Sequence, residues 1–299
     1  LHKFLAMLLM TVSCATLSVA QNVAQDVAQI GSTKYATLKA AVYDATAGQT
    51  VVTLINDVDL TTDDELDVNK MQDIVLDMNG HSIKGANADY KNICVSGKLT
   101  LMDSKENSTG KIYAETPYQD GVYDKPLVEV NNDGVFVMES GHINSVLAGN
   151  HQFVIGAYYN STVIINGGTI ESGWYAINGS NDEYHNTTIT INGGTLVSKA
   201  DYAISHPQSG TLTINSGAVV YGAAGAIDMK RGNLVVNGGI MTSKGKGNTG
   251  NWGDGTGDPD KAALNFCAPY GDVKAIIKGG TITAEGDAVL IDASFRSEE

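Results

Sequence analysis

Four residues in the second half of the chain carry side chains suited to acid–base chemistry on a sugar: His206, Asp228, Lys230 and Arg231. Their cationic groups could hold the carboxylate of an acidic sugar while a base removes the neighbouring proton. Support for this chemistry is thin, because Arg231 and Arg296 are the only arginines in the sequence. These four residues form the candidate catalytic set, and a purely structural role is the alternative.

A second set, mostly aromatic, surrounds the same stretch and is the candidate ligand-binding set. Aromatic rings can stack on the apolar faces of sugars, while amide and hydroxyl groups bind the sugar hydroxyls. The alternative is that these are ordinary rim residues, because single exposed aromatic residues are common on proteins. The members are Tyr158, Tyr159, Trp174, Tyr175, Asn178, Tyr184, Tyr202, Asn265 and Tyr270.

Two acidic clusters carry the oxygen donors that calcium prefers. One lies within residues 57–67, and the other consists of Asp254, Asp258 and Asp260. The second cluster has suitable spacing but matches no complete calcium-loop motif, so a solvated acidic loop is the alternative. Calcium is the one cofactor that the sequence brings into consideration.

An internal repeat predicts the elements that would position these residues. Copies such as 162–170 and 188–196 share an Ile-Asn-Gly-Gly-Thr core. The second glycine of successive copies falls at 141, 168, 194, 217, 239 and 280, giving steps of 27, 26, 23, 22 and 41 residues. Steps of 22 to 27 residues fit one coil of a parallel β-helix, and the longest step fits a coil with an inserted loop at about 244–260.

Alternation within each copy predicts which side chains face inward. Two inward columns are Val163, Ile189, Leu212, Leu234 and Ala275, and Ile165, Ile191, Ile214, Val236 and Ile277. A second strand would bury Ile170, Leu196, Val219 and Ile282, and a third would carry the pairs 176–177, 203–204, 226–227, 263–264 and 288–289. Outward residues just after the third strand should then align as a column of Asn178, Ser205, Asp228 and Asn265.

The predicted fold is all-β, a single-stranded right-handed parallel β-helix over residues 35–299 after a lead-in at 21–34. A β-sandwich is the main alternative, but it does not require the same sidedness at the same offset in every repeat. Residues 37–47 show the periodicity of an amphipathic helix, with Leu38, Ala41, Val42 and Ala45 on one face. Such a helix would cap the open end of the solenoid and protect its edge strands.

With its cap helix, the segment 79–83 and the Ile-Asn-Gly-Gly-Thr coils, the chain resembles the pectate-lyase-like β-helix superfamily over about residues 30–295. It resembles most the β-helix regions of adhesin-like surface proteins of gut-type bacteria. The resemblance implies the fold but no single activity, because the superfamily includes polysaccharide lyases, glycoside hydrolases and non-enzymatic adhesins. The paired aspartates of the related hydrolases do not appear on the coils.

The N-terminus predicts export. A basic start at His2 and Lys3, an apolar run and a small-x-small site ending at Ala20 form the pattern of a signal peptide over residues 1–20. A lipoprotein signal at Cys14 is the weaker alternative. Cys94 and Cys267 then remain, and the repeat places them many coils apart, which predicts two buried free cysteines rather than a disulfide.

The net charge of −14 disfavours binding to nucleic acid or to anionic membranes. No membrane insertion is expected after signal cleavage. An ice-binding array is disfavoured, because the Thr-x-Thr units at 188–190 and 211–213 align but those of neighbouring coils do not. We therefore expect a secreted or cell-surface protein that binds glycans or host-surface material or serves as a stalk. A carbohydrate-active enzyme, either a polysaccharide lyase or a glycoside hydrolase, is the alternative.

Overall fold

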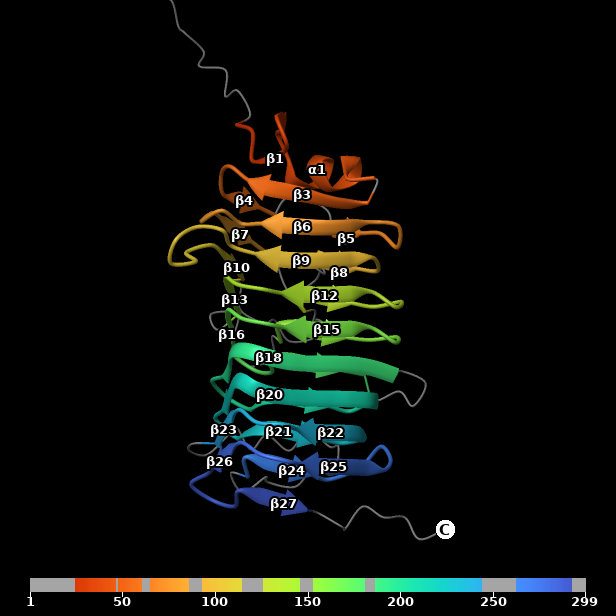
Figure 1. Cartoon of the computed structure of the whole chain (residues 1–299), viewed down its shortest axis with the longest axis vertical. Helices are drawn as coiled ribbons and strands as arrows, with labels where there is room; N and C mark the ends of the chain where they lie inside the picture. The colour runs from red at the N-terminus through yellow and green to blue at the C-terminus, as the bar shows by residue number, and fades with distance from the viewer. Residues whose placement is uncertain are drawn as a thin grey trace, which may run out of the picture.

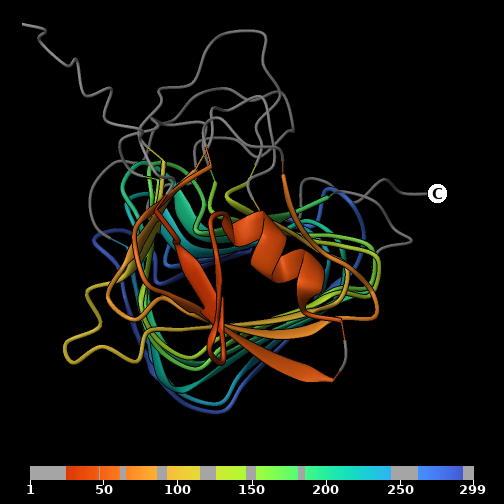
Figure 2. The ribbon, with the colours of Figure 1, turned by 90° about the horizontal axis from the view of Figure 1, so that it is seen from above.

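The computed structural model describes residues 25–46, 48–60, 65–85, 93–114, 126–145, 153–180, 186–243 and 262–291. Across these residues the chain is a parallel β-solenoid with one short helix at its N-terminal end (Figure 1). Seen from above, the coils lie over one another around a common interior (Figure 2). The fold therefore agrees with the β-helix that the repeat predicts.

Each coil contributes strands to three faces, which we call the first, second and third face. The first face consists of β3 (Gln49–Leu54), β6 (Asp73–Asp77), β9 (Lys98–Met102), β12 (Val135–Met138), β15 (Thr162–Ile165), the first parts of β18 (Asn186–Ser198) and β20 (Ser209–Gly222), β22 (Gly232–Val236) and β25 (Val273–Ile277). The second face consists of β4 (Val58–Asp59), β7 (Ser82–Lys84), β10 (Lys111–Tyr113), β13 (His142–Asn144), β16 (Thr169–Ser172), the last parts of β18 and β20, β23 (Ile240–Ser243) and β26 (Thr281–Thr283). The third face consists of β5 (Leu66–Val68), β8 (Ile93–Val95), β11 (Val128–Val130), β14 (Ile155–Ala157), β17 (Ile177–Gly179), β19 (Tyr202–His206), β21 (Gly225–Met229), β24 (Leu264–Phe266) and β27 (Val289–Ile291).

The inward columns predicted for the first face are confirmed. Val163, Ile189, Leu212 and Leu234 are each 0% exposed, and the residues two positions on are buried equally. The register pairs these residues directly from coil to coil. In β25 the same positions are exposed, Ile277 by 45%, because no further described coil covers them.

One inward residue of the second face was predicted wrongly. Between β18 and β20 the register shifts after Ile191, so that Thr195 pairs with Val219 and Leu196 with Val220. Val220 is 0% exposed, whereas Val219 is only partly buried. The coil holds one extra residue at this corner, and a one-residue shift moves the following side chains to the opposite face of the strand.

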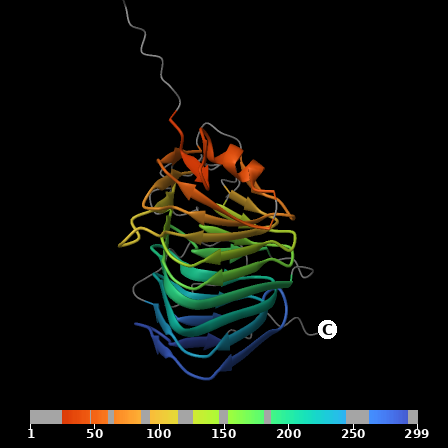
Figure 3. The ribbon, with the colours of Figure 1, turned by 45° about the horizontal axis from the view of Figure 1, so that its top comes forward.

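The N-terminal helix is shorter than the predicted span of 37–47. Helix α1 covers Leu38–Asp44, because the Thr37 side chain caps its first turn by accepting a hydrogen bond from Ala40 N at 3.1 Å. Its buried face consists of Leu38, Ala41 and Val42. Figure 3 shows the helix lying over the first coil beside β1 (Ala28–Ile30) and β2 (Thr33–Tyr35).

A buried glutamine holds this helix to the solenoid. The Gln72 amide nitrogen donates to the carbonyls of Val42 at 2.6 Å and Ala45 at 3.0 Å, at the C-terminal end of α1. The Val42 carbonyl also accepts from Ala45 N at 3.2 Å, so the glutamine adds a second contact there and reaches the Ala45 carbonyl from the coil below. The cap is therefore fixed by polar contacts as well as by its apolar face.

The corner between the first and second faces carries a ladder of asparagines. Asn192 donates to Asn166 at 2.8 Å, Asn215 donates to Asn192 at 2.7 Å, and Asn237 donates to Asn215 at 2.8 Å. At the upper end Asn166 donates to Glu139 at 2.9 Å. The asparagine of the repeat thus links successive coils by side-chain hydrogen bonds.

Removing a central rung of this ladder should destabilise the fold more than removing the last one. Asn192→Ala loses two ladder bonds, so we expect a loss of about 1–3 kcal/mol in the free energy of unfolding. Asn237→Ala loses one ladder bond, with an expected loss of about 0.5–1.5 kcal/mol. Urea unfolding of both variants measures the difference, and equal losses would show that the ladder does not link the coils.

Candidate functional site

The predicted outward column on the third face exists, but it is buried. Ser205 pairs with Asp228, and Asp228 pairs with Asn265 on the next coil. Their exposed fractions are 2%, 3% and 3%, in that order. The three residues align as the sequence predicts. The prediction that they face solvent is wrong for all three. Asn178 starts the column and is partly buried.

Asp228 is the centre of a buried polar cluster. Its Oδ1 accepts from Asn265 Nδ2 at 2.9 Å and from Cys267 Sγ at 3.4 Å, while Oδ2 lies 3.5 Å from Lys230 Nζ. Lys230 is itself only 7% exposed. A buried carboxylate needs such partners to stay charged, so the cluster is an ion-pair network, in which Asn265 Oδ1 has no hydrogen-bond partner among the described residues.

His206 does not join this cluster. It pairs with Met229, which pairs with Phe266, and both of these partners belong to the hydrophobic core. Alternation along β19 and β21 therefore turns His206 inward and Asp228 outward. The imidazole is 0% exposed, and its Nδ1 lies 3.0 Å from the Arg231 carbonyl. This geometry gives no support to His206 as a base beside Asp228.

Burial has a clear electrostatic consequence for His206. Desolvation lowers its pKa below the ordinary value of 6.5, and the contact with the Arg231 carbonyl opposes this only in part. The side chain is therefore kept neutral. Arg231 is partly buried, and its Nε would lie 2.5 Å from a Cβ added at Gly271. The four candidate catalytic residues thus divide between the core, the buried cluster and the rim.

Most of the predicted aromatic platform is a small hydrophobic cluster. Phe153, Tyr175, Tyr202 and Ala224 form its buried part, and Tyr158 and Trp174 pack against it. The Trp174 and Tyr175 ring centroids are 4.3 Å apart, and Trp174 meets Phe153 edge-on at 6.3 Å. Rings that pack on one another in this way contribute to stability rather than to an open sugar platform.

Sequence reasoning missed Asp201, which joins the aromatic and polar clusters. Its Oδ2 accepts from Trp174 Nε1 at 3.0 Å, and its Oδ1 accepts from Tyr202 N at 2.8 Å. Desolvation raises the pKa of Asp201, although these hydrogen bonds oppose the shift. Asp201 lies 27 residues after Trp174, which is one coil further along the repeat. That spacing could have predicted the contact between Asp201 and Trp174.

The remaining candidates are scattered. Tyr159 is 52% exposed at a corner turn, and Tyr270 is partly buried near the other end of the third face. Tyr184 and the predicted calcium ligands Asp254, Asp258 and Asp260 lie outside the described residues.

A different set of polar residues is accessible on the second face. Lys84, Tyr113, Asn144 and Glu171 form one outward column on four successive coils. Lys111 and His142 occupy the neighbouring column, and both are exposed. We call these six residues the second-face surface. Sequence reasoning missed it because the coils that carry Lys84 and Lys111 depart most from the Ile-Asn-Gly-Gly pattern.

Internal contacts hold the polar groups of the second-face surface in place. Asn144 Nδ2 donates to Glu171 Oε2 at 3.1 Å, and Lys199 Nζ pairs with Glu171 Oε1 at 3.2 Å. The Lys111 ammonium lies 4.4 Å from the centroid of the Tyr113 ring. A ring, an amide and charged groups thus occur together on consecutive strands.

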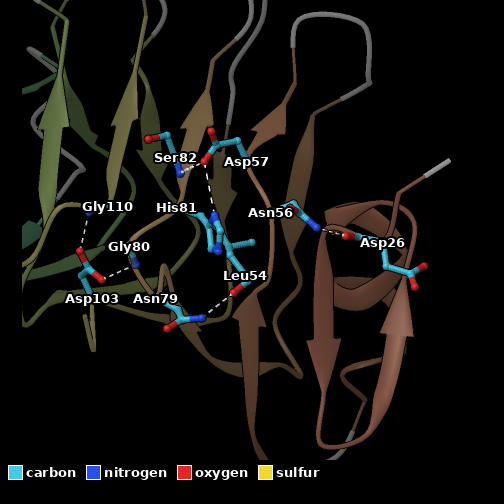
Figure 4. A network of polar contacts seen from close by, with 10 residues as sticks. All are labelled: Asp26, Leu54, Asn56, Asp57, Asn79, Gly80, His81, Ser82, Asp103 and Gly110. Carbon is cyan, nitrogen blue, oxygen red and sulfur yellow. Dashed lines mark hydrogen bonds and ion pairs between the residues drawn. The ribbon is translucent and has the colours of Figure 1, made fainter. Parts of the chain in front are cut away.

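The histidine of the first glycine turn has a structural environment. His81 Nδ1 lies 3.5 Å from Asp57, which also accepts from Ser82 N at 2.8 Å (Figure 4). Asp103 similarly accepts from Gly80 N and Gly110 N. These carboxylates satisfy backbone N–H groups at the turns between the first and second faces, which agrees with a non-chemical role for His81.

One group in the described part of the chain could hold a metal ion. Glu65, Asp67 and Cys94 each place a ligand atom within 4.8 Å of the others. A thiolate with carboxylates suits zinc better than calcium. Cys94 and Cys267 are both buried and do not form a disulfide, as predicted. Within the described residues, no helix is long and apolar enough to cross a membrane.

Comparison with known proteins gives no family. No protein-family model, curated protein or solved structure matched the chain.

Replacing His206 should flatten the acid dependence of stability. Below about pH 6.5 the unfolded chain binds a proton at this position that the folded chain does not. The free energy of unfolding therefore falls as the pH falls, by up to about 1.4 kcal/mol per pH unit. His206→Met should remove this slope between pH 7 and 5. Urea unfolding at each pH tests it, and an unchanged slope in the variant would contradict the assignment.

Removing one member of the buried ion pair should cost more than removing both. Lys230→Met leaves Asp228 buried without its cation, so we expect a loss of about 3–5 kcal/mol in the free energy of unfolding. Lys230→Met combined with Asp228→Leu should recover part of that loss. Thermal and urea unfolding measure both variants, and a double variant that is less stable than the single one would refute the interpretation.

Proposed function

We propose that the protein is an exported, surface-associated β-solenoid that binds glycans through the second-face surface. The observation that carries the proposal is the outward, partly exposed column of Lys84, Tyr113, Asn144 and Glu171 on adjacent coils. The signal-peptide pattern at residues 1–20 and the resemblance to the pectate-lyase-like superfamily and its adhesin-like members are consistent with this role.

The scaffold suits recognition of an extended ligand. Parallel strands repeat about every 4.8 Å, so each coil presents one outward side chain per column at a regular spacing. Hydrogen-bonded strands and buried inward neighbours such as Ile112 and Ile143, each 0% exposed, limit the movement of these side chains. A preorganised surface loses less entropy on binding than a flexible loop does.

Binding is better supported than catalysis. The candidate base His206 faces the core, and Asp228 and Lys230 are buried in a mutually satisfied network. A carbohydrate-active enzyme would need an accessible acid and base at the substrate. Among the described residues, the nominated set does not present such a pair to solvent.

Binding should depend on Tyr113 and not on the equivalent tyrosine further along. We expect Tyr113→Ala to weaken binding to its glycan by about 3- to 10-fold, because ring stacking contributes about 0.5–1.5 kcal/mol. Tyr221 lies in the same outward column with the same partial burial, but beside Val197 and Thr242. Tyr221→Ala is therefore the matched control, and its affinity should match that of the wild type.

The measurement is calorimetric titration with a panel of neutral and acidic oligosaccharides, after a screen of the same polymers for product release. Equal losses in the two tyrosine variants would remove the second-face surface as the site. New reducing ends or unsaturated sugars would replace the binding role with an enzymatic one.

A further inference from the structure

Lys111 and His142 on the second-face surface have no acidic partner in the described part of the chain. Lys111 and His142 pair directly across β10 and β13, and both are exposed. Lys98 and Lys199, by contrast, form ion pairs with Asp73 and Glu171 at 3.1 and 3.2 Å. Around Lys111, the contact that the structure records is the Tyr113 ring.

Lys111 and His142 lie on the surface of a protein whose net charge is −14. Most acidic proteins would gain by placing carboxylates beside exposed lysines, since even surface pairs are mildly favourable. Glu171, the acidic member of the second-face surface, has its charge balanced by Lys199. The centre of the surface is therefore locally cationic and does not repel an anion at short range.

We infer that the glycan bound by the second-face surface is anionic, with a carboxylate or sulfate group held between Lys111 and His142. The inference rests on the proposed glycan-binding function. The sugar ring that carries the anion lies against Tyr113, on the column beside Lys111 and His142. The Asn144 amide and the Glu171 carboxylate, one and two coils further on, bind the hydroxyls of the next sugar unit.

The lysine and the ring act together in this arrangement. The ammonium of Lys111 lies over the Tyr113 ring, 4.4 Å from its centroid, so the cationic group and the aromatic ring are direct neighbours on one strand. An anion bound there gains charge-assisted hydrogen bonds, which are about twice as strong as neutral ones. A neutral sugar gains only the stacking and the amide contacts, so discrimination should come from Lys111 and His142.

The test compares three oligosaccharides of equal length by calorimetry: a neutral one, a polyuronate and a sulfated one on a neutral backbone. Lys111→Gln removes the ammonium and His142→Gln removes the imidazole, and both variants keep a polar side chain of moderate length. Lys274→Gln is the matched control, because Lys274 is exposed on the first face at β25. Circular dichroism and the thermal midpoint of each variant check that the fold is retained.

We expect Lys111→Gln to weaken binding of an acidic oligosaccharide by about 3- to 10-fold. Binding of the neutral oligosaccharide should not change, and Lys274→Gln should behave as the wild type with every ligand. A preference for the polyuronate identifies the carboxylate as the recognised group, and a preference for the sulfated ligand identifies the sulfate.

Three results would overturn the inference. Equal affinity for neutral and acidic oligosaccharides would do so while leaving glycan binding intact, provided that Tyr113→Ala still weakens it. Equal losses in Lys111→Gln and Lys274→Gln would show unspecific charge attraction instead of a site. Absence of binding to all three ligands would remove the proposed function together with the inference.

Discussion

The structure depends on the in-register stacking of inward side chains from coil to coil. A parallel sheet wound into a solenoid closes its interior on all three faces, so every second residue of each strand must fit against the residue above and below it. Columns such as Val163–Ile189–Leu212–Leu234 meet that condition with 0% exposure. An extra residue is accommodated only at a corner, as happens after Ile191, where the asparagine ladder and the turn allow a shift of register.

The same alternation gives the outward residues three different roles. On the first face they are largely β-branched, including Ile164, Thr190, Thr213 and Val235, which stack directly on one another. On the third face they are polar yet buried, and Asp228 with Lys230 is satisfied within the protein. The second face presents polar and charged groups to solvent, so it is where the fold leaves side chains available for a ligand.

The sequence predicted the repeat, the inward columns and the alignment of Ser205, Asp228 and Asn265. It could not predict the burial of that column, because burial depends on segments distant in sequence that approach only in the folded chain. The orientation of His206 was predictable, since Ile204 faces inward and a residue two positions on must do the same. Proximity of suitable residue types in the sequence was given more weight than the strand period. Lys111 was missed because its coil matches the repeat poorly, whereas His142 lies in a recognisable copy and was interpreted as a turn residue without a chemical role.

The polar groups inside the solenoid show how to separate structural from functional residues. Gln208 is 0% exposed, and its amide nitrogen donates to Thr187 Oγ1 at 2.9 Å. It fits because a Cβ at Gly179 would lie 1.8 Å from its Oε1, so the glycine above leaves the space that the glutamine fills. The shape of the neighbouring coils therefore explains where Gln208 lies, although its Oε1 has no hydrogen-bond partner among the described residues. Lys111 and His142, by contrast, are exposed, and Lys111 contacts the Tyr113 ring, so the proposed binding of an anion relies on groups that solvent can reach.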